Sequence, residues 1–494
     1  MPISQPANSN EEVITDTLRL EKAAQIRTKP SLWLWIPYVW LFFAATRTLS
    51  TWLSGGVGSS SSMSDGNPVD RWLMSALILI GVVVLYSRLQ KLKRILVSNK
   101  WVVIFFVYLA LSIFWSNFPD ISLRRGVRSI GAFVMVLMVL TEPSAMEAVR
   151  VLLCRLYFVH IPLSVIAIKY VRNIGVAYNW SGVEEQWIGL SIDKNSLGQV
   201  AMCAGIFFFW QILQDWPRKK LTIYVPMLGL TLWILRGSKN IHSSSAILGF
   251  VVCAAALFGF EFLRKRPAAI KRYIIGGTVA AVFIVPLAYL GFSFFNTTPL
   301  QAVIHASGRD MTFTDRDLIW ADVMNNAAKS PILGVGVGAY WVGEIGYDRY
   351  PMPNWSAKTP GWRPEEGHNG FIDVYAELGI VGVLLLLGVI AYGFAGIFRE
   401  IETNFSFGTL RLALFLGIIL NNMAETSFLK GTHDLWFLFL LVVVAVPRST
   451  RKGGLGRQVL ASQDRHDMAG HGIERENFAA SDISDLHGMF VNRK

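Results

Sequence analysis

The sequence predicts an all-α membrane protein that crosses the bilayer about twelve times and carries one large extracytoplasmic loop. Hydrophobic residues make up 53% of the 494 residues, which is too large a share for one water-soluble core. Apolar runs of about 20 residues recur along the chain, separated by polar connections. The long polar connection covers residues 296–370. We therefore assign the chain to the polytopic membrane class and expect this loop to carry the chemistry.

The positions of the helices follow from the thickness of the bilayer. A hydrocarbon core of about 30 Å needs about 20 apolar residues of helix, or fewer where aromatic or charged residues flank the run. The runs that meet this condition are 32–53, 72–87, 101–115, 126–141, 150–169, 196–214, 221–235, 243–262, 274–295, 371–397, 408–427 and 433–447. The first nine occupy 32–295 and the last three occupy 371–447, on either side of the loop.

The termini and the basic residues predict the orientation. Residues 1–31 are polar and lack the apolar region of a signal peptide, and the tail 448–494 is polar without periodicity, so we expect a disordered tail. Lys and Arg concentrate in alternate connections, at 88–100, 218–220 and 264–272. Because cytoplasmic loops carry such an excess, both termini are predicted to be cytoplasmic. The loop then lies on the opposite, extracytoplasmic face of the membrane.

The net charge and the cysteines exclude several other classes. The charge of +12 comes from short clusters between apolar runs, which membrane orientation explains without a nucleic-acid partner. Cys154, Cys203 and Cys253 lie inside apolar runs, without Cys-x-x-Cys or Cys/His ligand spacing. They are interpreted as buried apolar residues, so neither a disulfide nor zinc is expected. No metal or cofactor is predicted, and the bilayer itself is the first expected partner.

His368 is the candidate catalytic residue, because it stands where the loop re-enters the membrane. Asn369, Asp373 and Glu377 follow it at a spacing that places them on one face of the next helix. A neutral imidazole near pH 7 can accept a proton, and a carboxylate nearby can fix its tautomer. The alternative is that these residues form only a hydrogen-bonded helix start.

Cations on the extracytoplasmic face form a second group of candidates. The positive-inside bias makes them unexpected there, and several stand at helix ends, where they could converge on an anionic group at headgroup depth. The alternative is that they reach lipid phosphates individually. The candidates are Arg124, Arg125, Lys194 with its neighbour Asn195, Arg236, Lys239, Arg309 and Arg316, together with Arg128 and Arg172.

The glycines at Gly334, Gly336 and Gly338 differ from a dinucleotide-binding loop. Their spacing is Gly-x-Gly-x-Gly, and no βαβ pattern surrounds them. They predict a tight backbone turn, with Tyr340 and Trp341 packing at the membrane interface.

Several of these segments, taken in order, resemble the O-antigen ligase and Wzy-type polysaccharide polymerase superfamily, in particular its exopolysaccharide polymerase branch. The resemblance spans roughly residues 115–427. The matching segments are Trp-Ser-Asn-Phe-Pro-Asp-Ile-Ser-Leu-Arg-Arg (115–125), Gly-Leu-Ser-Ile-Asp-Lys-Asn-Ser-Leu-Gly (189–198), Thr-Asp-Arg-Asp-Leu-Ile-Trp (314–320), Pro-Ile-Leu-Gly-Val-Gly-Val-Gly-Ala-Tyr-Trp (331–341) and His-Asn-Gly-Phe-Ile-Asp-Val-Tyr-Ala-Glu-Leu-Gly-Ile-Val-Gly (368–382).

The resemblance implies a GT-C-like membrane glycosyltransferase that uses oligosaccharides linked to undecaprenyl pyrophosphate and needs no metal. It implies that His368 is the base that activates an acceptor hydroxyl and that Arg316 holds the pyrophosphate. A growing polysaccharide would be the acceptor, and a chain-length regulator and export proteins are further expected partners. Ile188 and Asp193 stand where family members often carry Arg and His, so Lys194, Arg236 or Lys239 could hold the phosphate instead.

Two other functions are compatible with the same residues. One is a ligase that transfers a finished glycan to a lipid or protein acceptor. The other is a flippase for lipid-linked oligosaccharides, whose cations would line a central cavity in the membrane.

Overall fold

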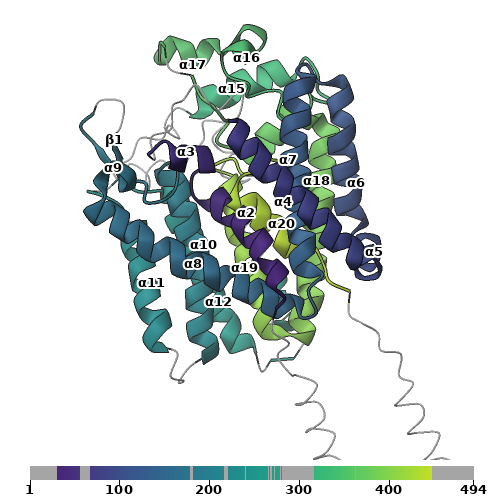
Figure 1. The fold of residues 1–494 in the computed structure, drawn as a ribbon, viewed down its shortest axis with the longest axis vertical. Helices are drawn as coiled ribbons and strands as arrows, with labels where there is room; N and C mark the ends of the chain where they lie inside the picture. The colour runs from purple at the N-terminus through teal and green to yellow at the C-terminus, as the bar shows by residue number, and fades with distance from the viewer. Residues whose placement is uncertain are drawn as a thin grey trace, which may run out of the picture. The chain divides into compact units, whose positions relative to one another are not determined.

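The computed structural model describes residues 30–447, except for 56–66, 179–181, 216–220, 240, 265, 268–269, 272, 279, 281–315 and 362 (Figure 1). All described residues up to Val446 belong to one compact unit, Met1–Val446. Residues 1–29 of the predicted N-terminal segment, the predicted C-terminal tail, most of the predicted helix 274–295, and Arg309 lie outside the described residues.

The described unit is built almost entirely from helices. In chain order they are η1 (Leu32–Leu34), α2 (Trp35–Ala45), α3 (Leu49–Leu53), α4 (Pro68–Ser87), α5 (Leu89–Ser98), α6 (Lys100–Leu111), η3 (Ser112–Trp115), α7 (Pro119–Leu140), α8 (Ala145–Tyr170), α9 (Arg172–Gly175), α10 (Lys194–Asp215), α11 (Leu221–Arg236), α12 (Ser244–Leu263), α15 (Arg316–Ala327), α16 (Glu344–Arg349), α17 (Pro353–Lys358), α18 (Gly370–Thr403), α19 (Phe405–Asn422) and α20 (Asp434–Val443). Strands β1 (Val176–Tyr178) and β2 (Glu185–Trp187) form an antiparallel pair in which Val176 lies opposite Trp187.

Six described helices are long and apolar enough to cross a membrane, and the bent pair Leu89–Ser98 and Lys100–Trp115 brings the number to seven if it forms one span. The six are Pro68–Ser87, Ala145–Tyr170, Lys194–Gln214, Ser244–Leu263, Gly370–Thr403 and Phe405–Asn422. The protein is therefore a multi-pass helical membrane protein, as predicted. The remaining predicted runs include shorter apolar helices, such as Leu221–Arg236 and Asp434–Val443, so the number twelve stays a prediction.

The first predicted run, 32–53, is not one continuous helix. Helix α2 ends at Ala45, and the chain turns before α3 begins at Leu49. Arg47 lies buried in this turn, where its Nε donates a hydrogen bond to the Ser191 carbonyl oxygen at 3.1 Å. A buried guanidinium needs such acceptors, so the turn is fixed to the loop that precedes α10.

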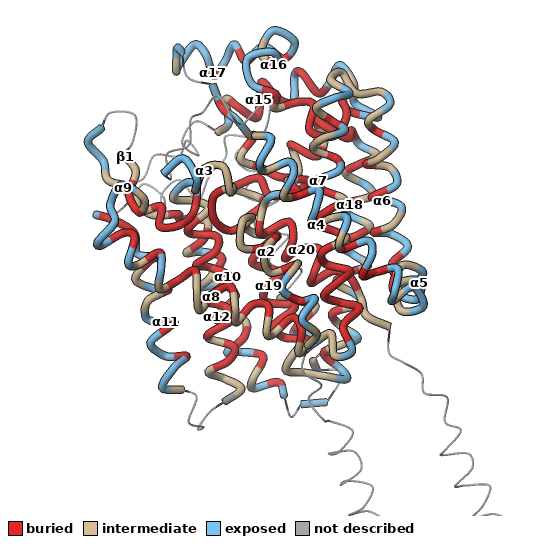
Figure 2. Tube along the Cα trace, viewed as in Figure 1, coloured by how far each residue is buried: buried red, intermediate tan, exposed pale blue. Residues whose placement is uncertain are grey.

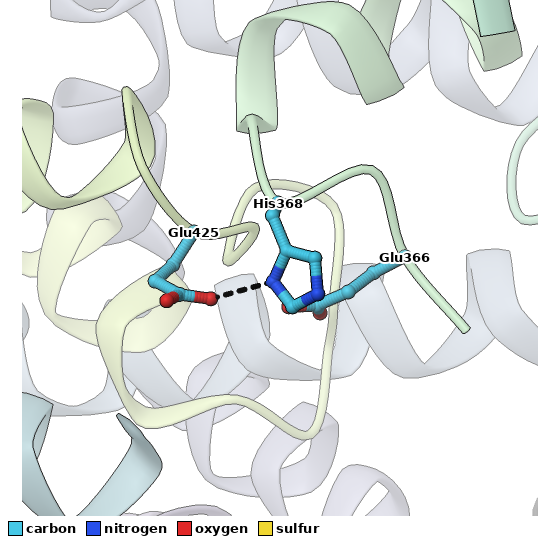
Figure 3. Close-up of side chains that lie close together, drawn as sticks. All are labelled: Glu366, His368 and Glu425. Carbon is cyan, nitrogen blue, oxygen red and sulfur yellow. Dashed lines mark hydrogen bonds and ion pairs between the residues drawn. The ribbon is translucent and has the colours of Figure 1, made fainter. Parts of the chain in front are cut away.

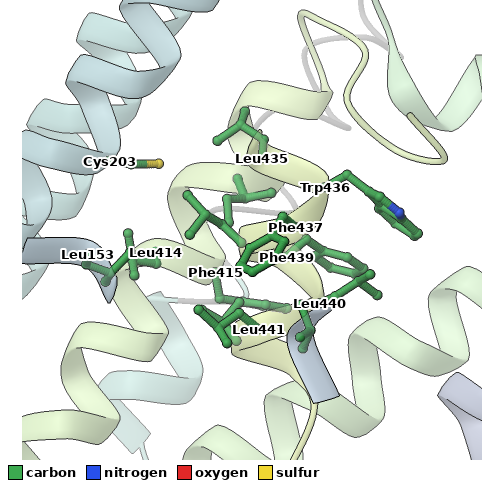
Figure 4. Packing of buried hydrophobic residues seen from close by; sticks show 14 of the residues in the cluster. Leu153, Cys203, Leu414, Phe415, Leu435, Trp436, Phe437, Phe439, Leu440 and Leu441 are labelled. Atoms are coloured by element: carbon green, nitrogen blue, oxygen red, sulfur yellow. The ribbon is translucent and has the colours of Figure 1, made fainter. Parts of the chain in front are cut away.

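The apolar core surrounds α20, which packs against α7, α18 and α19. Trp436, Phe437 and Phe439 of this helix are fully buried (Figure 4). Buried residues concentrate around α19 and α20, whereas α6 and α11 expose much of their outer surface (Figure 2). Among the described residues none of the three cysteines forms a disulfide; Cys203 and Cys253 are buried, as predicted, and Cys154 is half-buried.

The described part of the loop, 316–369, forms a layer with its own apolar cluster above one end of α7 and α18 (Figure 1). Ile319, Val323, Tyr350 and Trp355 pack in this cluster with Tyr340. Tyr340 is 3% exposed and stacks on Tyr350 with ring centroids 4.7 Å apart, and its predicted position at the membrane interface stays a prediction.

Candidate active site

The site is built around the start of α18, where the loop returns to the helices. Asn369 has extended backbone angles, and its Oδ1 accepts hydrogen bonds from the N–H groups of Phe371 at 3.0 Å and Ile372 at 3.3 Å. This is the capping arrangement that satisfies the free N–H groups of a first helical turn. The Asn369 N–H itself donates to Thr426 Oγ1 at 3.1 Å, which joins the start of α18 to the turn after α19.

Asp373 and Glu377 share the loop-facing side of α18, as their spacing predicted. Asp373 accepts hydrogen bonds from Trp341 Nε1 at 3.0 Å and from the Gly367 N–H at 3.1 Å. Glu377 Oε2 accepts one from the Gly338 N–H at 2.7 Å. Both side chains are buried, so they hold the loop in place and do not face water.

The predicted tight turn of glycines is confirmed, since Gly334, Gly336 and Gly338 all have positive φ angles. The turn packs against a break in α18 at Gly379, whose φ of 65° is not helical. A Cβ on Gly334 would lie 2.4 Å from the backbone of Glu377, so the approach of the two segments excludes a side chain there.

His368 lies between two carboxylates from different segments (Figure 3). Its Nδ1 is 2.8 Å from Glu425 Oε2 and 3.1 Å from Glu366 Oε1. The other oxygens of these carboxylates face cations: Glu425 Oε1 is 2.7 Å from Arg316 Nη2, and Glu366 pairs with Lys430. We call these five residues the His368 cluster. It joins the start of α15, the start of α18 and the turn between α19 and α20.

The His368 cluster changes the expected protonation of the imidazole. Burial alone would lower the pKa of His368, but the hydrogen bonds and charges of Glu366 and Glu425 outweigh it and raise the pKa to about 9. Burial raises the pKa of Glu366, yet Lys430 and His368 outweigh this and hold it well below its usual range. His368 is therefore mostly protonated at pH 7, in contrast to the neutral imidazole expected from the sequence.

Arg316 is held by the same carboxylate as His368. Its Nη1 donates to the Ala424 carbonyl oxygen and its Nη2 pairs with Glu425, while its side chain is 17% exposed. A guanidinium has five N–H groups, so three remain without a protein partner among the described residues. Arg316 can thus bind Glu425 and still offer N–H groups to an anion.

Arg125 has a different environment from the one its predicted role requires. Its Nη1 donates to the carbonyl oxygens of Gly338 at 2.8 Å and Trp341 at 2.7 Å. These contacts make it a support of the glycine turn. Its predicted contact with pyrophosphate stays a prediction.

Four other predicted cations lie at or near helix ends, outside the His368 cluster. Lys194 begins α10 with Asn195 beside it, Arg236 ends α11, and Lys239 follows with a φ of 40°. Arg124 lies in the first turns of α7. Within the described residues, neither Asn195 nor any of these four cations forms a hydrogen bond or ion pair with the His368 cluster. Neither Lys194 nor Arg316 lies midway along a spanning helix, which the flippase alternative would require.

Sequence reasoning missed three members of the His368 cluster: Glu366, Glu425 and Lys430. Glu425 is 4% exposed, at the end of an apolar run. A carboxylate buried in that position needs a cationic partner, and this was the signal available in the sequence. The identity of the partner depends on the packing of α18 beside α19, which one sequence does not reveal.

Glu366, His368 and Glu425 offer three ligand atoms within 4.8 Å of one another, which is close enough for a metal ion. However, each carboxylate already has a cationic partner, so Arg316, His368 and Lys430 outnumber the two acidic groups. A divalent ion would add charge to a group that is already positive. The arrangement is better described as an ion-pair network.

Fold and site together define a multi-pass membrane protein with a charged, half-buried site in the loop between its spanning helices. Residues 240–387 match the family model described as O-antigen ligase. The chain is also 24% identical over 307 residues to the exopolysaccharide production protein ExoQ of Rhizobium meliloti (strain 1021). That alignment covers 60% of this chain and 65% of the relative, so slightly less than two thirds of the relative is matched. These two matches confirm the predicted resemblance to the O-antigen ligase and Wzy-type polymerase superfamily.

Proposed function

We propose that this protein joins oligosaccharide repeat units linked to undecaprenyl pyrophosphate into an exopolysaccharide, by metal-independent glycosyl transfer. The observation that carries the proposal is the His368 cluster, which places an imidazole and a guanidinium on one carboxylate beside the spanning helices. The matched family region contains both Arg316 and His368. The printed name of the relative, an exopolysaccharide production protein, supports the choice of product.

The proposed reaction exchanges one bond for another at the anomeric carbon of the donor. The acceptor hydroxyl forms a bond to that carbon, and the bond from the carbon to the pyrophosphate oxygen breaks. Undecaprenyl pyrophosphate leaves with the electron pair, and the hydroxyl proton passes to Nε2 of His368 in its neutral form, which is the minor form at pH 7. Pyrophosphate leaves without being protonated, so the site needs a base on the acceptor and cations where negative charge grows.

Arg316 is the proposed contact for the pyrophosphate, through the N–H groups that Glu425 and Ala424 leave free. Lys194, Arg236, Lys239, Arg309, Arg124 and Arg125 are proposed as further cations on the path of the lipid-linked donor. The proposal needs no cofactor. Its partners are the lipid-linked oligosaccharide, the growing polysaccharide and the bilayer, and a chain-length regulator and export proteins would act on the product.

The proposed topology has twelve spans in a GT-C-like arrangement, in the bacterial inner membrane. Its parts are a cytoplasmic segment 1–31, spans within 32–295, a periplasmic loop 296–370 with the active site, spans within 371–447 and a cytoplasmic tail 448–494.

The topology can be tested at Ser356, which is exposed in α17. Ser356→Cys is expected to react with a membrane-impermeant thiol reagent in cells whose outer membrane alone is permeabilised. The protein without the added cysteine gives the background from Cys154. Labelling that appears only after the inner membrane is lysed would place the loop in the cytoplasm and contradict the proposal.

Arg316→Ala is expected to weaken use of the lipid-linked donor, while Arg316→Lys retains part of it, because a point charge replaces only some of a two-pronged phosphate contact. The loss of a charged hydrogen bond costs about 1.5–3 kcal/mol, which is roughly a tenfold to hundredfold loss of activity at low donor concentration. The measurement is polymer yield against donor concentration at equal protein levels. Normal yield from both variants would show that the pyrophosphate is held elsewhere.

A ligase is the second candidate, because the matched family model is described as O-antigen ligase. The two functions differ in the acceptor. Cells that lack the protein should contain single lipid-linked repeat units if it is a polymerase. They should contain full-length glycan still on its lipid carrier if it is a ligase.

A further inference from the structure

An exposed apolar tip stands at the edge of the loop, where Pro331, Ile332 and Leu333 precede the glycine turn. Ile332 is 62% exposed and Leu333 is 43% exposed. Such side chains are uncommon at the tip of a loop that faces water. Backbone hydrogen bonds to α18 also fix the position of the tip.

The break in α18 holds the tip in place. At Gly379 the helix loses its regular hydrogen bonds, and the Ile380 N–H donates to the Pro331 carbonyl oxygen at 2.9 Å. The Val381 N–H donates to the Ile332 carbonyl oxygen at 3.3 Å. A Cβ at Gly379 would lie 2.2 Å from that same oxygen, so the contact needs glycine.

The break also marks a boundary in the polarity of α18. From Gly379 to Phe398 the helix has no charged residue, and these roughly 20 residues span about 30 Å, which is the thickness of a bilayer core. Arg399 follows at one end of this stretch. Glu377 and Asp373 precede the other end. The break therefore lies at the edge of the hydrocarbon on the His368 side.

The surface around the tip is continuous with exposed apolar surfaces on α6 and α18. Helix α6 packs beside α18 and exposes an apolar stripe that continues into Phe114, which is 86% exposed. The stripe consists of Trp101, Ile104, Val107 and Leu111. On α18 the exposed residues Ile380, Leu384 and Leu387 begin directly after the break.

Two amphipathic aromatic side chains hold the tip at this level. The Trp115 Nε1 donates to the Leu333 carbonyl oxygen at 3.2 Å, and the Tyr108 hydroxyl donates to the Leu378 carbonyl oxygen at 2.9 Å. Tryptophan and tyrosine concentrate at the boundary between hydrocarbon and headgroups, where one end of the ring is apolar and the other is polar. Their position agrees with the boundary set by the charges of α18.

We propose that Pro331–Leu333 inserts into the lipid leaflet on the His368 side and that the acyl chains of that leaflet cover Ile332 and Leu333. The tip is joined to the site through the glycine turn, because the Val335 and Gly336 N–H groups donate to the carbonyl oxygens of Ala376 and Glu377. The depth of the tip in the lipid thus sets the height of His368 above the membrane. A lipid-linked donor would meet the cluster at a fixed distance from the bilayer.

The test measures the depth of a fluorescent label at the tip. Ile332→Cys is labelled with an environment-sensitive fluorophore in protein that carries Cys154→Ala, and the protein is reconstituted in phosphatidylcholine vesicles. Ile345→Cys in α16 is the matched control, because Ile345 is similarly exposed at 63% and lies outside the tip. Protein without an added cysteine gives the background.

The label at position 332 is expected to emit at shorter wavelength than the label at 345. Lipids with a nitroxide on the upper acyl chain should quench it several-fold more strongly than they quench the control. Leu333→Cys should behave as Ile332→Cys does, which guards against one poorly folded variant. Equal quenching of both labels by aqueous iodide, with no quenching by the nitroxide lipid, would overturn the proposal. It would indicate that the tip faces water or is a binding surface for another protein.

Discussion

His368→Ala is expected to lower polymer formation by about 10²–10⁴-fold, which is the range that general acid–base groups contribute. The protein should still be present in the membrane, and lipid-linked repeat units should accumulate. His368→Gln keeps a hydrogen bond to Glu425 but lacks basicity, so we expect it to be nearly as inactive. The measurement is polymer yield and membrane abundance for the Ala, Gln and Asn variants together.

If His368 has only a structural role, the opposite results are expected. In that case Gln or Asn would restore activity, and Ala would reduce only abundance or thermal stability. His368 has a φ of 48°, a backbone conformation that Asn adopts more readily than most residues. Among the three variants, Asn is therefore expected to disturb the backbone least. An active Asn variant would contradict a catalytic role of His368.

The raised pKa of His368 also predicts how the rate depends on pH. With a pKa of about 9, only about 1% of the protein carries a neutral imidazole at pH 7. If His368 is the base, kcat/KM should rise about tenfold per pH unit from pH 7 and level off above pH 9. A rate that falls over this range would show that the imidazolium is the active form and acts as a cation toward the pyrophosphate.

Substitution of Glu425 has the second large expected effect, because this carboxylate binds both His368 and Arg316. Glu425→Ala leaves two cations without their shared partner. Loss of one member of a buried pair costs on the order of 3 kcal/mol, and somewhat less here because Arg316 is partly exposed. Glu425→Gln retains hydrogen bonding but lowers the pKa of His368, so its pH profile should move to lower pH. Thermal unfolding in detergent and the pH dependence of the rate measure the two effects.

The matched control for Glu425 is Glu142→Gln. Glu142 is also a buried carboxylate, 2.7 Å from Arg88, but it lies in the turn between α7 and α8. It should lose stability without any shift of the pH profile. A profile that stays unchanged in Glu425→Gln as well would contradict the assigned coupling between Glu425 and His368.

The sign of the stability effect follows from the direction of the pKa shift. The folded protein holds the proton of His368 more tightly than the unfolded chain does, because the pKa rises from 6.5 to about 9. The ion pairs of His368 therefore contribute fully below pH 6.5, and their contribution is lost as the pH rises through about 9. Glu425→Ala should weaken this pH dependence of thermal stability.

Local patterns predicted the features that depend on neighbouring residues. The apolar runs identified the six described helices that are long and apolar enough to cross a membrane, because bilayer thickness sets the length of such helices. Asn369 and the three glycines predicted a helix start and a tight turn, since each depends on nearby backbone geometry. A break at Gly379 was not predicted, because glycine inside an apolar run does not by itself indicate which segment will pack against it.

The composition of the candidate site depends on contacts between distant segments. Glu425 is 57 residues from His368, and Arg316 is 109 residues from Glu425. No local spacing connects such positions. The protonation of His368 could not be predicted for the same reason, since it depends on Glu366 and Glu425 together. Arg125 was predicted as a substrate contact from its charge, but its described hydrogen bonds go to the glycine turn.

We propose above all that this protein forms glycosidic bonds from a lipid-linked donor at the His368 cluster. The direct test reconstitutes the purified protein in vesicles with repeat units linked to undecaprenyl pyrophosphate and no other acceptor. We expect glycans of two or more repeat units, one undecaprenyl pyrophosphate released for each new linkage, and neither product with His368→Gln. Intact donor after incubation with folded wild-type protein, or equal product from His368→Gln, would contradict the claim.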